Sequence, residues 1–264
     1  SMDKEQDEDG VLSLKRLIDK GRELINGGDK AYKDAVIDAE SMSILLFTSG
    51  TTDLAKGVML SHKNICTNIT SVCSTVHIDS NDSSLSILPL HHTYECTLGF
   101  LTLIYNGATI SFNEGLKHIV KNLKEVNPTL LVSVPLILEN MHKKIMAQAR
   151  KKRFMTTKLK VALIVSNFLY KLFKVDLRRK LFKQIHDNIG GNVRLIITGA
   201  AAIDPQVSKW FRHIGIQVLQ GYGLTECAPL VAGNRDSAFV DSSAGLPIPG
   251  VEVRINNPNE DGIG

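Results

Sequence analysis

The sequence predicts an α/β fold in layers, with a largely parallel sheet and flanking helices. Two observations predict it: short apolar runs of strand length recur along the chain, and between them apolar residues return at helical spacing. Because alternating strands and helices usually pair the strands in parallel, this pattern favours one sheet covered on both faces. The chain has 264 residues, of which 43% are hydrophobic, so it is long enough to bury such a core.

Six apolar runs have the length and composition of strands. They lie at residues 44–47, 85–88, 108–112, 130–134, 193–197 and 216–219.

Helices are expected between these runs. Apolar residues have helical spacing over 65–76 and over 116–126. A further helix should begin at Asp204, an N-cap followed by Pro205, and stop at Gly215. Ligands bind beyond the carboxyl ends of parallel strands, so the glycine-containing segments that follow the first and the last of the six strands are the expected site.

The first of these segments, LLFTSGTTDLAKGVMLSH at residues 45–62, has the composition of a phosphate-binding loop. It is not a Walker P-loop, because Lys56 precedes Gly57 and no hydroxyl follows the lysine. A strand, a hydroxyl-rich turn, a lysine and a helix capped near Ser61 still suit a polyphosphate. The alternative is a solvated loop that joins a strand to a helix.

The second segment, QGYGLTECAP at residues 220–229, offers groups suited to a nucleotide. Tyr222 supplies a flat ring for a base, Thr225 a hydroxyl for a phosphate oxygen, and Glu226 a carboxylate for magnesium. The segment lacks the third glycine of a dinucleotide fingerprint. Taken alone, it is equally an ordinary Gly-Tyr-Gly turn.

A third motif, LPLHHTYE at residues 88–95, contains His92 and Glu95. Their spacing supplies no third metal ligand and no H-E-x-x-H pattern, which argues against a metal site here. The apolar run CTLGFLTLIYNG that follows suits the wall of an acyl channel and a protein core equally.

Charge is unevenly distributed along the chain, although the formal net charge is only +4. Residues 1–40 hold eleven acids against seven Lys/Arg, whereas residues 143–183 hold fourteen Lys/Arg against one acid, Asp176. The basic segment suits either solvated helix faces or amphipathic helices that lie on an anionic membrane. No nucleic-acid-binding motif accompanies the charge, so no nucleic-acid partner is expected.

The four cysteines form no C-x-x-C pair and have no zinc-site spacing, which fits free thiols in a reducing compartment. We therefore expect a cytoplasmic protein, with peripheral membrane contact through residues 143–183 as the open alternative.

Five motifs occur in the order and approximate spacing of the adenylate-forming (AMP-binding) enzymes: TSGTTDLAKGV, LPLHHTYE, ITGAAAIDP, QGYGLTE and GLPIPGVEVRI. The sequence around them most resembles AMP-forming long-chain fatty acyl-CoA synthetases. The resemblance extends over residues 36–264 and implies the central part of the large N-terminal domain of such an enzyme. On this basis residues 1–40 end a preceding subdomain, 41–243 form the ATP- and acyl-binding core, and 244–264 begin a β-rich subdomain.

The resemblance also implies a role for each site residue. The phosphates of ATP would be cradled by Thr48, Ser49, Gly50, Thr51, Thr52 and Lys56, and adenine would lie between Gly199, Ala200, Ala201 on one side and Gly221, Tyr222 on the other. Thr225 would contact the α-phosphate, and Glu226 would hold Mg²⁺. His92 would lie beside the carboxylate of the acyl substrate, unless it is a histidine packed at a strand end and bonded to backbone. The expected catalytic residues are Thr225, Glu226, Lys56 and His92.

The implied activity is the ATP-dependent conversion of a fatty acid to an acyl-adenylate, followed by transfer to coenzyme A. The family's hinge and its lid with the catalytic lysine are not recognised in this sequence, so this chain alone is expected to be a weak catalyst. One alternative is a family member that activates another carboxylate or transfers the acyl group to a carrier protein. The other is a non-catalytic nucleotide- or acyl-binding module.

Asp53 departs from the resemblance, since family members usually have glycine at its position. A carboxylate about 4 Å from a phosphate charge adds roughly 1 kcal/mol of repulsion in water and about 4 kcal/mol in a partly buried site. If Asp53 instead points to solvent or caps the following helix, it has no such effect. We expect a working loop with weakened or altered phosphate affinity.

Overall fold

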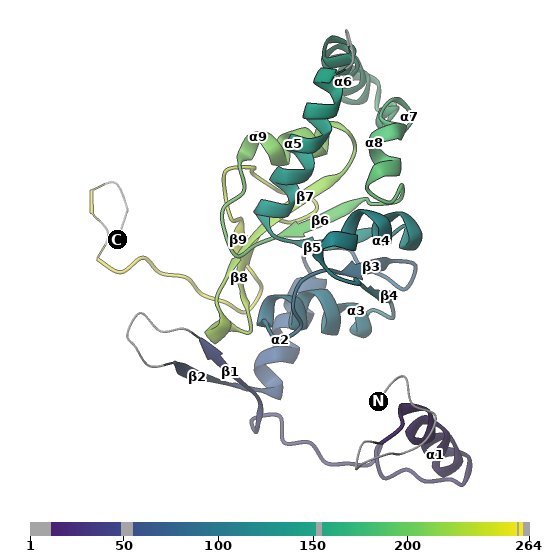
Figure 1. Cartoon of the computed structure of the whole chain (residues 1–264). Coiled ribbons are helices and arrows are strands. Elements are labelled where there is room, and N and C mark those ends of the chain that lie inside the picture. Colours follow the sequence, from purple (N-terminus) through teal and green to yellow (C-terminus); the bar gives the residue numbers. More distant parts are fainter. Residues whose placement is uncertain (1–11, 49–54, 152–154, 258, 261–264) are drawn as a thin grey trace. The chain divides into compact units, whose positions relative to one another are not determined.

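The computed structural model describes residues 12–48, 55–151, 155–257 and 259–260 (Figure 1). The chain divides into two compact units, Ser1–Ala39 and Glu40–Gly264. The smaller unit contains one described helix, α1 (Leu14–Asn26), whose N-cap Ser13 accepts a hydrogen bond from the Arg16 amide. All elements named below belong to the larger unit.

The larger unit is built on a seven-stranded sheet (Figure 1). Five strands pair in parallel, and the last two are added antiparallel at one edge. In spatial order the strands are β4 (Thr109–Phe112), β3 (Ser83–Ser86), β5 (Leu130–Ser133), β6 (Leu195–Thr198), β7 (Gln217–Gly223), β8 (Leu230–Gly233) and β9 (Leu246–Pro247).

Helices cover both faces of this sheet, as the alternation of strands and helices predicts. Neighbouring residues on the central strand β6 point to opposite faces and pack in different hydrophobic clusters. Leu195 packs in one buried cluster with Leu103, and Ile196 packs in the other with Phe211. Because both faces are buried, the central strands β5 and β6 are continuous apolar runs rather than alternating ones. The helices are α2 (His62–Cys73), the π-helix η1 (Tyr94–Leu101), α3 (Thr102–Tyr105), η2 (Leu116–His118), α4 (Ile119–Val126), α5 (Pro135–Lys151), α6 (Met155–Phe173), α7 (Arg178–Leu181), α8 (Lys183–Asn188), α9 (Pro205–His213) and η3 (Thr225–Cys227).

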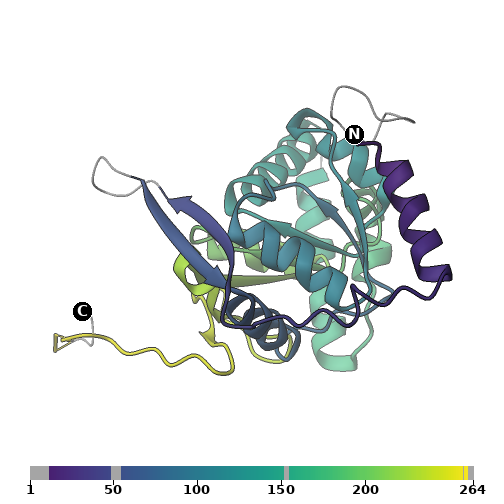
Figure 2. The same cartoon turned by 90° about the horizontal axis from the view of Figure 1, so that it is seen from below.

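The predicted strand at 44–47 exists, but its expected place in the parallel sheet is wrong. It lies in β1 (Met42–Thr48), which pairs antiparallel with β2 (Lys56–Ser61) in a separate two-stranded sheet (Figure 2). Only one face of this hairpin is covered: Ile44 packs against the α2 cluster, whereas Phe47 is 70% exposed. A strand inside the main sheet would be buried on both faces.

The predicted helix starts are confirmed at two places. Ser61 and Asn64 form a reciprocal capping box at the start of α2, each side chain accepting from the other residue's amide. Asp204 caps α9 by accepting from the Gln206 amide, and Pro205 is the first helical residue.

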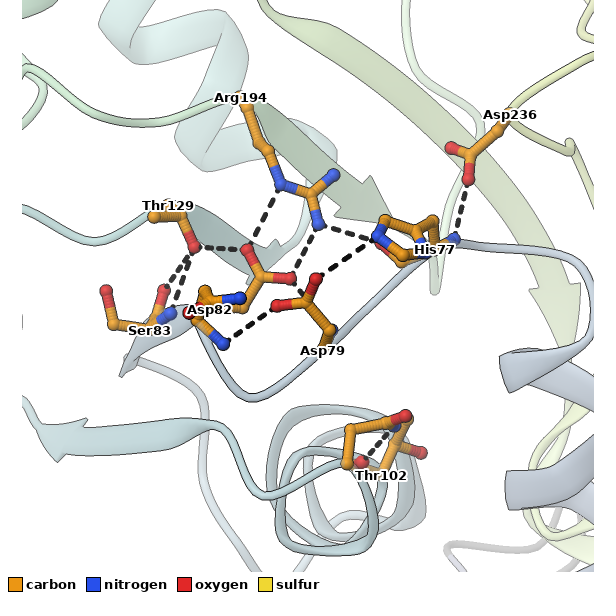
Figure 3. Close-up of polar contacts among 10 residues, drawn as sticks. His77, Asp79, Asp82, Ser83, Thr102, Thr129, Arg194 and Asp236 are labelled. Atoms are coloured by element: carbon orange, nitrogen blue, oxygen red, sulfur yellow. Dashed lines mark hydrogen bonds and ion pairs between the residues drawn. The ribbon is translucent and has the colours of Figure 1, made fainter.

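A bidentate ion pair ties together the amino ends of three parallel strands (Figure 3). Arg194, just before β6, donates through Nε and Nη2 to both oxygens of Asp82, just before β3, at 3.1 and 2.6 Å. Thr129, just before β5, donates its hydroxyl to Asp82 Oδ1 at 2.6 Å. Burial works to raise the pKa of Asp82, but Arg194, Thr129 and the Asp79 amide outweigh it and hold that pKa below its usual range.

We predict that Arg194→Met lowers the free energy of unfolding by about 2 kcal/mol at neutral pH, because it leaves the buried Asp82 carboxylate without its cation. The figure is below that for a fully buried pair, since the Arg194 side chain is 36% exposed. Urea unfolding measures the change. The control Lys121→Met removes the exposed pair with Glu114 and should cost almost nothing.

The lowered pKa of Asp82 gives this prediction a pH dependence. The stability from the ion pair is present above the ordinary pKa of an aspartate and is lost as pH falls through the lower pKa of folded Asp82. The difference between wild type and Arg194→Met should therefore shrink in acid. A difference independent of pH would contradict the assignment.

Candidate active site

The carboxyl ends of β5 and β6 lie level with each other and with Gln220 of β7. The register pairs Ser133 with Thr198 and Thr198 with Gln220. The segment that begins at Gly199 therefore leaves the sheet beside Gly221, from which β7 continues to Gly223 paired with β8. This is the edge where α/β sheets bind ligands.

A cavity of about 440 Å³ opens at this edge, within the size range of small-molecule sites. Its walls come from η1 and the segment before it, from the ends of β5, β6 and β7, and from the start of β8. Six of the residues predicted from sequence line it: His92, Gly199, Ala200, Gly221, Tyr222 and Thr225.

Tyr94 explains why residue 199 is glycine. The Tyr94 hydroxyl lies 3.1 Å from two carbonyl oxygens, those of Ser133 and Ile197, and so joins η1 to the ends of β5 and β6. A Cβ on Gly199 would meet the Tyr94 ring at 3.3 Å, closer than most such contacts. The protein's own packing therefore disfavours a larger residue at this position before any ligand is considered.

The neighbouring backbone is strained or closely packed. Ala200 has a φ of 69°, a left-handed conformation that costs a non-glycine residue about 1 kcal/mol. A Cβ on Gly221 would lie 2.7 Å from Leu230 Cδ1, and one on Gly223 would overlap the Pro229 carbonyl oxygen. Strained backbone of this kind clusters at functional sites.

A second hollow of about 270 Å³ shares a wall with the first. His92, Thr93 and Thr225 line both, and the second adds Thr48 from the end of β1. Thr48 is the cross-strand partner of Lys56. The end of the hairpin that bears Thr48 and Lys56 thus lies next to the residues expected to meet the carboxylate and the α-phosphate. The predicted phosphate residues Ser49, Gly50, Thr51 and Thr52 lie outside the described residues, as does Asp53.

Four predicted residues among those described do not line the main cavity: Thr48, Lys56, Ala201 and Glu226. Ala201 is exposed beside it, and Glu226 is exposed on η3, where it lines a separate hollow of about 170 Å³. Within the described residues, no group of three or more His, Cys, Asp or Glu side chains is placed to hold a metal ion. A magnesium ion carried by nucleotide phosphates needs only one or two carboxylates, so Glu226, directly after Thr225, fits that kind of site.

Glu95 is a feature of the cavity whose role sequence reasoning missed. Its side chain is 1% exposed; Oε1 accepts a 2.5 Å hydrogen bond from Ser86, and Oε2 has no partner. A Cβ on Gly99, one turn along η1, would lie 2.5 Å from the carboxyl group, so a larger residue there would displace it. Burial raises the pKa of Glu95 to about 7, against the opposing effect of the Ser86 hydrogen bond.

One signal in the sequence and one in the structure draw attention to this segment. In the sequence, Glu95 stands directly before a long apolar run, where an acid is uncommon unless it has a specific environment. The eight-residue π-helix that carries Glu95 is itself a rare element, found often at functional sites.

The family profile described as "AMP-binding enzyme" matches residues 1–263. The chain belongs to this family. As an AMP-binding enzyme it has relatives among long-chain-fatty-acid ligases, as the sequence motifs indicated. It is 31% identical over 250 residues to long-chain-fatty-acid–CoA ligase 1 of Cavia porcellus, covering 90% of this chain and 34% of that protein.

A second relative has a different acceptor in its name. The chain is 27% identical over 297 residues to the chloroplastic long-chain-fatty-acid–[acyl-carrier-protein] ligase AEE15 of Arabidopsis thaliana, covering 96% of this chain and 40% of that protein. The chain thus spans well under half the length of these two relatives.

Solved structures confirm the fold of this family member. A benzoate CoA ligase from Burkholderia xenovorans superposes with a TM-score of 0.60 at 21% identity, over 86% of this chain and 38% of that one. ATP-bound MatB from Rhodopseudomonas palustris gives a TM-score of 0.58 at 22% identity, over 86% and 38%.

We predict that Glu95→Gln flattens the dependence of stability on pH. The pKa of Glu95 is about 7 in the folded chain against 4.5 for an ordinary glutamate, so folding is most favourable below pH 4.5 and weakens as pH rises through 7. The total loss is about 3 kcal/mol. Urea unfolding measures stability across this pH range. The loss seen in wild type should be absent in Glu95→Gln and retained in Glu125→Gln, which changes an exposed carboxyl. Parallel curves for wild type and Glu95→Gln would contradict the assignment.

Gly223→Ala should destabilise the chain by about 2 kcal/mol, because the added methyl must displace the backbone of Pro229. Gly233→Ala, on the adjacent strand, is the matched control. Its methyl would meet only Leu230 Cδ2 at 3.6 Å, so it should change stability by less than about 1 kcal/mol. Thermal unfolding distinguishes the two, and equal effects would show that the close approach at residue 223 is not important.

Proposed function

We propose that this chain forms the nucleotide- and carboxylate-binding part of an enzyme that activates a fatty acid with ATP and transfers it to coenzyme A. The observation that carries the proposal is the cavity at the carboxyl edge of the sheet, where His92, Thr225 and both glycine-containing walls meet. The fatty acid is proposed because the two relatives described above are named for long-chain fatty acids.

The reaction has two steps. A carboxylate oxygen attacks the α-phosphorus of ATP, a new C(O)–O–P bond forms, and pyrophosphate leaves. The thiolate of coenzyme A then attacks the acyl carbon, and AMP leaves with the electron pair of the broken C–O bond. The first step brings two anions together, so it depends on positioning and on neutralising charge.

The cavity offers positions for each part of the nucleotide. In this proposal adenine lies between the segment Gly199–Ala201 and the segment Gly221–Tyr222, where small residues leave the backbone open to a flat ring. The Thr225 hydroxyl donates to an α-phosphate oxygen. It lines both hollows, so it is placed between the adenine side and the Thr48 side of the site.

The β- and γ-phosphates and the magnesium ion are assigned to residues at the edge of the site. Lys56 and the loop residues Thr48, Ser49, Gly50, Thr51 and Thr52 would hold the β- and γ-phosphates. Glu226 would hold Mg²⁺, which supplies charge neutralisation when bound. Lys56 and Glu226 are exposed in the described structure and so are accessible to a nucleotide.

His92 is proposed to orient the substrate carboxylate. It is exposed and lines both hollows, which suits contact with a ligand better than packing at a strand end. The carboxylate would then lie between Thr225 and the apolar wall formed by Leu88, Pro89 and Val134.

A second candidate function is transfer of the acyl group to a carrier protein. The observation that favours it is the Arabidopsis relative, which is named as an acyl-carrier-protein ligase and covers 96% of this chain. Both functions share the adenylation step and differ only in the thiol that accepts the acyl group.

The test is carboxylate-dependent ATP–pyrophosphate exchange by the longest natural polypeptide that carries this sequence, with straight-chain acids from acetate to stearate. We expect exchange that is greatest with long acids. Thr225→Val should lower it by about 100-fold, the effect of removing one donor to a developing charge. The control Thr109→Val, at the exposed amino end of β4, should leave exchange unchanged.

Exchange that peaks with another class of acid would reject the fatty acid and keep adenylation. Binding of ATP with no exchange for any acid would reject adenylation in favour of a binding module. Coenzyme A and acylated carrier protein, compared as acceptors, then separate the two candidate functions.

A further inference from the structure

Helix α6 has an apolar stripe on the side that faces away from the core. Its inner side packs on the main core through Leu159, Ala162 and Leu163. The opposite side carries five apolar side chains that are between 46% and 70% exposed: Val161, Ile164, Val165, Phe168 and Leu172. We call these five residues the outer stripe.

The spacing of the outer stripe places all five side chains in one row. They stand at positions i, i+3, i+4, i+7 and i+11, so they share one face of the helix. A helix that packs on a core by one face normally has polar residues on the other. Soluble chains rarely expose a contiguous apolar patch of more than a few hundred Å² without a binding role.

Lysines border this row on both sides. At 100° per residue Lys158 lies along one border, and Lys160 and Lys171 lie along the other; all three are exposed. The neighbouring α5 ends in Arg150 and Lys151 (Figure 1).

The one acid between residues 143 and 183 does not offset this charge. Asp176 is already paired with Arg178 at 2.6 Å. The surroundings of the outer stripe are therefore strongly cationic.

Charge complementarity indicates which partner binds the outer stripe. A second copy of the chain would place lysines against lysines, which opposes pairing of two outer stripes. An anionic lipid surface neutralises the lysines at about 1 kcal/mol each, while its acyl region accepts the apolar side chains. No helix in the described part of the chain is long and apolar enough to span a bilayer, so this contact would lie along the membrane surface.

We propose that the outer stripe of α6 and its bordering lysines form a docking surface for an anionic phospholipid membrane. This inference depends on no step of the proposed catalysis. Its consequence is that the chain would work at the surface into which long-chain acids partition.

The test is co-sedimentation of the chain with vesicles, without ATP or fatty acid. We expect binding to equimolar phosphatidylglycerol and phosphatidylcholine, much weaker binding to phosphatidylcholine alone, and release as salt rises. The pair Ile164→Glu and Phe168→Glu should lower partitioning onto anionic vesicles by more than about tenfold, since it removes two large apolar side chains. The triple change Lys158→Gln, Lys160→Gln and Lys171→Gln should lower it by a similar factor.

Matched controls come from α4 and the turn before it. Val120→Glu changes a side chain that is 50% exposed, and Lys117→Gln with Lys124→Gln removes two exposed lysines. These variants should bind as wild type does. All substituted positions are exposed, and circular dichroism melting checks that each variant folds.

A local reporter makes the result specific to α6. The chain has a single tryptophan, Trp210, so the indole introduced by Phe168→Trp can be followed over one background signal. Its emission should shift to the blue on anionic vesicles. No vesicle binding by wild type, no blue shift, or stripe variants that bind as wild type would overturn the proposal. A stripe variant that turns a dimer into a monomer without affecting vesicle binding would assign the surface to a second copy instead.

Discussion

The level register of β5, β6 and β7 is the constraint on which the rest of the candidate site depends. Ser133, Thr198 and Gln220 are paired across the three strands, so the segment after Thr198 begins beside Gly221 of β7. A shift of one residue in any strand would turn its side chains to the opposite face and move its exit segment out of line. The Tyr94 hydroxyl, shared between the carbonyls of Ser133 and Ile197, secures the same alignment from η1.

The two edges of the sheet differ in whether their polar groups have hydrogen-bond partners. At the amino edge Asp82, Arg194 and Thr129 satisfy one another and fix the strand starts (Figure 3). At the carboxyl edge polar groups are left without partners, and Glu95 keeps one buried oxygen without a hydrogen bond. A satisfied network at one edge and an unsatisfied one at the other is the pattern expected when the second edge is built for a ligand.

Sequence reasoning predicted the parallel sheet, the start of α9 and the meeting of His92, Gly199 and Thr225 in one cavity. It succeeded where a pattern repeats along the chain, as the alternation of strands and helices does, and where a local signal has one physical meaning, such as an Asp-Pro cap. It misplaced the strand at 44–47, because a run of four apolar residues does not tell whether one face or two are covered. It also gave Glu95 no role, since the burial of that acid comes from Ser86 and Gly99, which only the folded chain brings to it.

The central claim is that the cavity between the two glycine-containing segments holds an acyl-adenylate. Hydrogen–deuterium exchange, with and without an unreactive sulfamoyl analogue of a long-chain acyl-adenylate, tests it on the longest natural polypeptide that carries this sequence. The account predicts slower exchange at residues 199–201 and 221–225 together. Protection confined to other segments, or to only one of these two, would contradict it.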